Sequence, residues 1–123
     1  MSVGFLKKKD FAEIYVKGNV SCADFVAMYH QLFAAYDKTD HLKLLINILT
    51  YQNQLSVENF TEILSDADRH SINKIDMVVV SRDPSRPLIG QMIEALAQNF
   101  HVAVSVRFAH DIGQGERMTL ETK

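Results

Sequence analysis

The sequence predicts an α/β fold in which a mixed, mainly parallel sheet of about five strands is flanked by helices. Segments with strand periodicity alternate with segments of helical periodicity from one end of the chain to the other. The connections between them are short, and the two most apolar strands lie in the middle of the order, as a parallel sheet covered on both faces requires. We therefore expect one domain over residues 1–123, with a sheet order that follows the chain.

The first two predicted strands form an antiparallel hairpin. Residues 3–8 and 11–17 have strand character, and Lys9-Asp10 between them is typical of a tight turn. In the second strand the core face carries Ala12, Ile14 and Val16, and the half-solvated face carries Phe11, Glu13, Tyr15 and Lys17.

Ser21 and Ser56 are the expected N-caps of two helices, because a serine hydroxyl can accept a hydrogen bond from an amide of the first turn. The first of these helices is expected to run to about Tyr36. Leu42–Leu49 and Ile75–Val80 are expected to be strands buried on both faces. The remaining elements are a helix over Leu88–Ala97, a strand over Val102–Phe108 and a weakly patterned helix through Met118 and Leu120.

Composition and charge exclude several classes of protein. Thirteen Lys and Arg against fifteen Asp and Glu give a formal net charge of −2, so we expect no nucleic-acid partner. The longest apolar run, Leu44–Leu49, is interrupted by Asn47 and is far shorter than the ~20 residues of a membrane helix, so we expect no stable membrane insertion. No signal peptide is recognisable before the lysines at 7–9, and a cytoplasmic location is expected. Cys22 is the only cysteine, which excludes an internal disulfide.

Polar residues follow the predicted central strands. Ligands of open α/β sheets bind beyond the carboxyl ends of the strands, which makes Thr50, Tyr51, Ser81 and Arg82 candidate ligand-loop residues. Arg82 would precede a helix N-terminus, where a small anion could bind. The other interpretation is that these loops are polar only because they cap helices.

No catalytic or metal-binding constellation stands out. No two histidines are spaced four residues apart, so we expect surface histidines rather than metal ligands or acid–base groups. The histidines are His30, His41, His70, His101 and His110. We expect no enzyme, no metal and no cofactor, with catalysis by the polar loops as a less favoured interpretation.

The elements also occur in a recognisable order. Phe11–Gly18 leads into a helix capped by Ser21, Leu42–Leu49 forms a central strand, and Ile75–Val80 is followed by the helix over Leu88–Ala97. This order, at this length, resembles the SpoIIAA-like proteins of the STAS superfamily, and the resemblance covers most of the chain. It implies a SpoIIAA-like (STAS-like) fold. The chain is most similar to a divergent, mostly uncharacterised branch that has been likened to lipid carriers of the CRAL-TRIO type.

The resemblance gives Ser56 a second interpretation. Members that act as anti-anti-sigma factors have a phosphorylatable serine at the start of the helix after the central strand, and Ser56 has this position. The Asp-Ser pair followed by glycine of those members is absent here. Ser56 is therefore a candidate phospho-switch as well as a candidate N-cap.

The sequence leads to two functional hypotheses. In the first, the protein is a non-catalytic regulatory or protein-binding module that docks a protein partner or forms a homodimer, with Phe11 and Tyr15 as candidate interface residues. In the second, it carries a small hydrophobic or lipid-like ligand, with Arg82 near the mouth of the site. The aromatic side chains of the first two helices are expected to be core, and an excess that one sheet face cannot cover would line a cavity or a dimer interface. The candidates are Phe25, Tyr29, Phe33, Tyr36 and Phe60.

Overall fold

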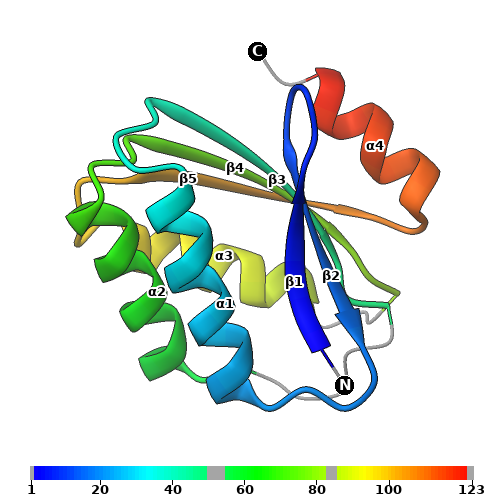
Figure 1. Ribbon diagram of the computed structural model, residues 1–123, viewed down its shortest axis with the longest axis horizontal. Helices are drawn as coiled ribbons and strands as arrows, with labels where there is room; N and C mark the ends of the chain where they lie inside the picture. The colour runs from blue at the N-terminus through cyan, green and yellow to red at the C-terminus, as the bar shows by residue number, and fades with distance from the viewer. Residues whose placement is uncertain (1, 50–54, 83–85, 122–123) are drawn as a thin grey trace.

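The computed structural model describes residues 2–49, 55–82 and 86–121 of the chain. It contains a five-stranded sheet and four helices (Figure 1). In chain order the elements are β1 (Ser2–Lys7), β2 (Ala12–Lys17), α1 (Cys22–Ala35), β3 (His41–Asn47), α2 (Val57–Arg69), β4 (Lys74–Val80), α3 (Arg86–Ala97), β5 (Ala103–Ala109) and α4 (Ile112–Glu121).

The order of the strands in the sheet is β1-β2-β3-β4-β5, which follows the chain. β1 and β2 form an antiparallel hairpin, and every later pair of neighbours is parallel. Parallel crossovers are almost always right-handed, so crossovers that step in one direction place their helices on one face. In Figure 1, α1, α2 and α3 share one face of the sheet and α4 lies on the other. The predicted α/β architecture is confirmed.

Both predicted N-caps are present. Ser21 Oγ accepts a hydrogen bond from the Asp24 amide at 3.1 Å. Ser56 forms a capping box with Asn59, because each side chain accepts a hydrogen bond from the other residue's amide. These caps fix where α1 and α2 begin, and thus how the two helices lie on the sheet.

The larger core lies between the sheet and α1–α3. The side chains of Phe33 on α1, Leu44 on β3 and Ile75 on β4 are completely buried there. This face receives every second residue of each strand, as the two-residue period of a strand requires. The aromatic stripe of α1 is therefore core, with Phe25 and Tyr29 also buried.

The second face of the sheet is only partly covered. α4 lies over the carboxyl halves of the central strands, where Leu45, Val78 and Val80 form a smaller core. The amino halves of the same strands carry Lys43 and Asp76 on this face. Ile75–Val80 is nevertheless buried on both faces, as expected. Leu42–Leu49 departs from the expectation, because Lys43 and Asn47 on the second face are only half-buried.

The two candidate interface residues lie on this second face. Phe11 is half-buried and packs against the smaller core below α4. Tyr15 is half-exposed, and the ammonium group of Lys17 lies 5.5 Å from the centre of its ring. Self-association through these side chains stays a prediction, and Phe11 already has an intramolecular role.

Candidate functional site

An apolar cavity of about 70 Å³ lies between the sheet and the three helices α1, α2 and α3. The strand residues that line it come from the middle or the carboxyl-terminal parts of β3, β4 and β5 or directly follow β3. The cavity is therefore at the end of the sheet where open α/β folds bind ligands. The described lining residues are Phe25, Tyr29, Ile46, Ile48, Leu55, Phe60, Ile63, Leu64, Met77, Val79, Ile89, Gly90, Ile93, Val106 and Phe108.

The helix aromatics shape this cavity. Phe25 and Tyr29 lie one turn apart on α1 with their ring centres 5.6 Å apart, and Phe60 reaches the cavity from α2. On the third side, Gly90 lets α3 approach β5 closely, because a Cβ atom there would lie 2.9 Å from the Phe108 ring. Its described walls are almost entirely carbon, so the cavity suits an apolar ligand.

Exposed apolar side chains occur at the same end of the sheet. Leu49 follows β3, Val57 begins α2 and Leu88 lies in the first turn of α3. Their exposed fractions are 40%, 49% and 69%. Each is within two residues of a side chain that lines the cavity. This rim can offer further apolar contact to a ligand that extends out of the cavity.

Two of the four candidate ligand-loop residues, Ser81 and Arg82, lie in the described part of the chain. Ser81 is buried, and its amide donates to the Ala109 carbonyl at 3.0 Å, which continues the pairing of β4 with β5. Arg82 is exposed at the carboxyl end of β4. Thr50 and Tyr51 lie outside the described residues.

Ser56 is exposed at the start of α2, and its hydroxyl is engaged with Asn59. Ser56 Oγ accepts from the Asn59 amide at 3.1 Å and donates to Asn59 Oδ1 at 3.0 Å. The N-cap interpretation is confirmed. A role as phospho-switch stays a prediction.

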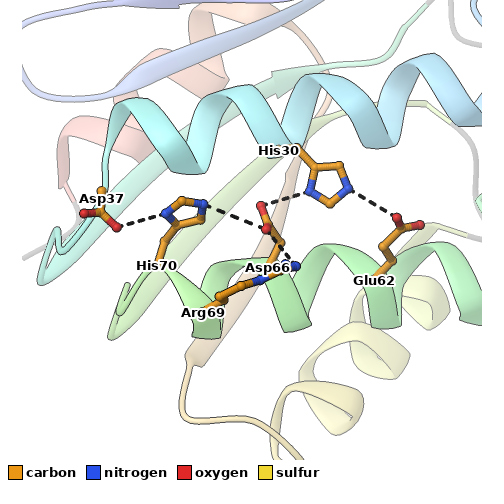
Figure 2. A network of polar contacts seen from close by, with 6 residues as sticks. All are labelled: His30, Asp37, Glu62, Asp66, Arg69 and His70. Carbon is orange, nitrogen blue, oxygen red and sulfur yellow. Dashed lines mark hydrogen bonds and ion pairs between the residues drawn. The ribbon is translucent and has the colours of Figure 1, made fainter.

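Polar contacts join α1 to α2 on the side of the helices away from the sheet (Figure 2). We call this group the α1–α2 polar seam. At its centre is the carboxyl group of Asp66, which is buried. Asp66 Oδ2 lies 2.9 Å from His30 Nδ1, and Asp66 Oδ1 lies 3.0 Å from Arg69 Nη2. The members of the seam are His30, Asp37, Glu62, Asp66, Arg69 and His70.

The seam changes the pKa of His30. Its contact with the Asp66 carboxylate raises the pKa above the ordinary value of 6.5, and Glu62 adds to this, although burial acts in the opposite direction. A raised histidine pKa stabilises the fold fully below the unfolded value and ceases to do so as the pH rises through the folded value. The contribution of His30 is therefore present in mildly acidic solution and lost in alkaline solution.

A second polar group lies on the second sheet face, at the amino-terminal half that α4 does not cover. Asp76 on β4 accepts a hydrogen bond from the Ser105 hydroxyl and contacts His41 Nε2 on the neighbouring strand. Burial alone would raise the pKa of Asp76, but the bonds from Ser105 and His41 outweigh it and lower the pKa below 3.8. Asp76 is thus ionised and satisfied, and it supports the pairing of β3, β4 and β5 from within the sheet.

The chain matches no family model, no curated protein and no solved structure. Within residues 2–49, 55–82 and 86–121, no helix is both long enough and apolar enough to cross a membrane. No three or more His, Cys, Asp and Glu side chains in these ranges are placed to hold a metal ion.

Neither polar group is predicted by the sequence pattern. The sequence predicts histidines scattered on the surface. In the structure His30 and His41 contact carboxylates that are 32 and 35 residues away in the sequence, and His70 lies near the buried Asp66. One signal was available for Asp76, because a charged residue in an apolar strand must find partners. No comparable signal existed for the seam, since its pairs depend on which faces of α1 and α2 meet.

Proposed function

We propose that the protein is a non-catalytic binding module that holds a small apolar ligand, or the apolar end of an amphipathic one, in the cavity between α1, α2, α3 and the sheet. One observation carries this proposal. The carboxyl end of the sheet, where folds of this class bind ligands, holds an apolar cavity with walls from three helices and three strands.

The size of the cavity limits the ligand. An apolar cavity of roughly 150 Å³ can take up a benzene molecule. A cavity of about 70 Å³ suits a shorter group, such as the end of an alkyl chain. The exposed rim of Leu49, Val57 and Leu88 would contact the next part of the ligand. Arg82 follows β4 at this end of the sheet and remains the candidate partner for an anionic head group.

The other hypothesis, a regulatory module of the SpoIIAA-like kind that docks a protein or a second copy, stays a prediction. The small-ligand function has the stronger support, because the helix aromatics Phe25, Tyr29 and Phe60 line a cavity instead of filling the core completely. Phe11 packs against the smaller core, which leaves Tyr15 as the more accessible of the two candidate interface residues.

Straight-chain alcohols from propanol to octanol test the proposed function. Each methylene that enters the cavity is expected to raise the affinity about fourfold, from about 0.8 kcal/mol of burial, until the chain fills the available space. Binding is measured by NMR from the methyl signals of Ile46, Ile63 and Val79, with the methyls of Val78 as the reference on the opposite face. Chemical-shift changes that do not depend on the length of the alcohol, or that are equally large in both cores, would contradict the proposal.

A matched pair of substitutions on β4 controls this experiment. Val79→Ile points its extra methyl group toward the cavity, so it is expected to leave stability unchanged or to raise it, and to weaken alcohol binding. Val78→Ile places the same group in the closely packed core under α4, where overpacking costs about 1–3 kcal/mol. Thermal unfolding and the alcohol titration together distinguish the two faces. Equal losses of stability in both variants would show that no usable space exists beside Val79.

A further inference from the structure

His30 contacts a carboxylate with each of its ring nitrogens. Nδ1 lies 2.9 Å from Asp66 Oδ2, and Nε2 lies 3.2 Å from Glu62 Oε1 (Figure 2). A neutral imidazole has only one N–H, so it can donate to one carboxylate and must turn a lone pair toward the other. Only the protonated ring satisfies both contacts. The geometry around His30 is therefore that of a proton-binding site.

Asp66 makes the seam depend strongly on this proton. Its side chain is buried, and the contact of Oδ2 with His30 Nδ1 is an ion pair whose geometry is not that of a hydrogen bond, with no other hydrogen-bond partner for Oδ2 in the described chain. The charge of His30, 2.9 Å away, is thus the main compensation for this oxygen. The other oxygen, Oδ1, lies 3.0 Å from Arg69 Nη2 and 3.9 Å from His70 Nε2.

The charges of the whole seam balance only when its histidines are protonated. Three carboxylates, of Asp37, Glu62 and Asp66, then face His30, His70 and Arg69; with neutral histidines, Arg69 alone opposes them. Two charged groups of neighbouring elements have partners outside the seam. His101 contacts Asp68, Lys7 lies over the Tyr36 ring, and the sheet beneath α1 and α2 presents apolar side chains.

The seam and the cavity share the same two helices. α1 provides Phe25 and Tyr29 to the cavity wall, and Tyr29 directly precedes His30. α2 provides Phe60, Ile63 and Leu64, and Ile63 directly follows Glu62. Movement of α1 relative to α2 would therefore change the cavity.

We propose that His30 is a proton-operated latch that holds α1 against α2 and so regulates ligand binding in the apolar cavity, an inference that rests on the proposed function. The ligand contacts both walls only while the helices are held together. Proton binding and ligand binding thus favour the same state and strengthen each other. As the pH rises from 5.5 to 8.5, the affinity falls and the ligand exchanges faster.

Two measurements test the latch, and only one of them needs a ligand. The first is the dissociation constant of 1-hexanol from pH 5.5 to 8.5, since this probe does not titrate. It is expected to rise about fivefold, at the low end of the usual coupling between two binding events, because deprotonation of His30 weakens the contact between α1 and α2. The second is the hydrogen-exchange protection of α1 and α2 amides over the same range, corrected for the intrinsic rate. This protection is expected to fall as the pH rises, whereas the protection of the β3 and β4 amides stays constant.

His30→Gln removes the titrating group and keeps a polar side chain. It is expected to bind hexanol weakly at every pH, with the pH dependence lost. His101→Gln is the matched control, because His101 is almost fully exposed and contacts Asp68 outside the seam; it should behave like the wild type. Asp66→Asn is the second variant and should also flatten the pH profile.

The outcomes separate the latch from the proposed function. An unchanged pH profile in His30→Gln overturns the latch, and so does pH-independent protection of α1 and α2 in the wild type. If hexanol does not bind at any pH but protection still falls with pH through His30, the proposed function fails and the proton-dependent contact between α1 and α2 stands.

Discussion

Replacing Phe33 by alanine is expected to lower the free energy of unfolding by about 3–5 kcal/mol, the usual cost of deleting a buried aromatic ring. Phe33 is completely buried at the centre of the α1 stripe, and its ring centre lies 5.7 Å from that of Tyr29. It does not line the apolar cavity, so its removal opens a new space in closely packed surroundings. Denaturant unfolding followed by circular dichroism measures the loss.

Phe25→Ala provides the comparison on the same helix. Phe25 is also buried, but one side of its ring borders the cavity and makes fewer contacts, so the expected loss is smaller, about 2–3 kcal/mol. The deletion also enlarges the cavity, and longer alcohols or benzene should then bind. A loss at Phe25 as large as that at Phe33, with no gain in binding, would mean that the cavity does not extend to the Phe25 ring.

The fold could be predicted because its signals are local. The alternation in β2, the cap residues Ser21 and Ser56 and the apolar runs in β3 and β4 each specify an element within a few residues of sequence. Short parallel crossovers then leave few possible strand orders. What the pattern did not show is how far α4 covers the second sheet face, because this depends on the length and position of a single helix.

The candidate site was predictable only in part. The many aromatic residues of α1 and α2 predicted core, with a cavity or an interface only for an excess, and the structure places Phe25, Tyr29 and Phe60 around a cavity. The polar seam was not predictable, since His30 and Asp66 are far apart in the sequence. Their contact requires α1 and α2 to lie side by side in one rotation about their axes, and packing of the apolar stripes on the sheet sets that rotation.

The helical pattern of α4 is weak in the sequence, because Gly113 and Gly115 interrupt it. Of these two, close packing requires a glycine only at position 115. A Cβ atom on Gly115 would lie 2.8 Å from Leu45 Cδ1 and 2.9 Å from Val80 Cγ2, so α4 rests directly on the central strands at this position. The nearest atom to a Cβ on Gly113 is Asp111 Oδ1 at 3.4 Å, within ordinary contact distance.

Alanine at these two positions is therefore expected to have opposite effects. Gly113→Ala should stabilise the protein by up to about 1 kcal/mol, because alanine favours the helix over glycine. Gly115→Ala has the same helical advantage but must push α4 away from Leu45 and Val80, and overpacking of this kind costs about 1–3 kcal/mol. Thermal unfolding gives the two stabilities, and hydrogen exchange in α4 shows whether the helix has loosened. If Gly115→Ala is as stable as Gly113→Ala and protects α4 equally well, the close contact between α4 and the sheet is refuted, and with it the reason why one short helix can cover the carboxyl halves of β3 and β4.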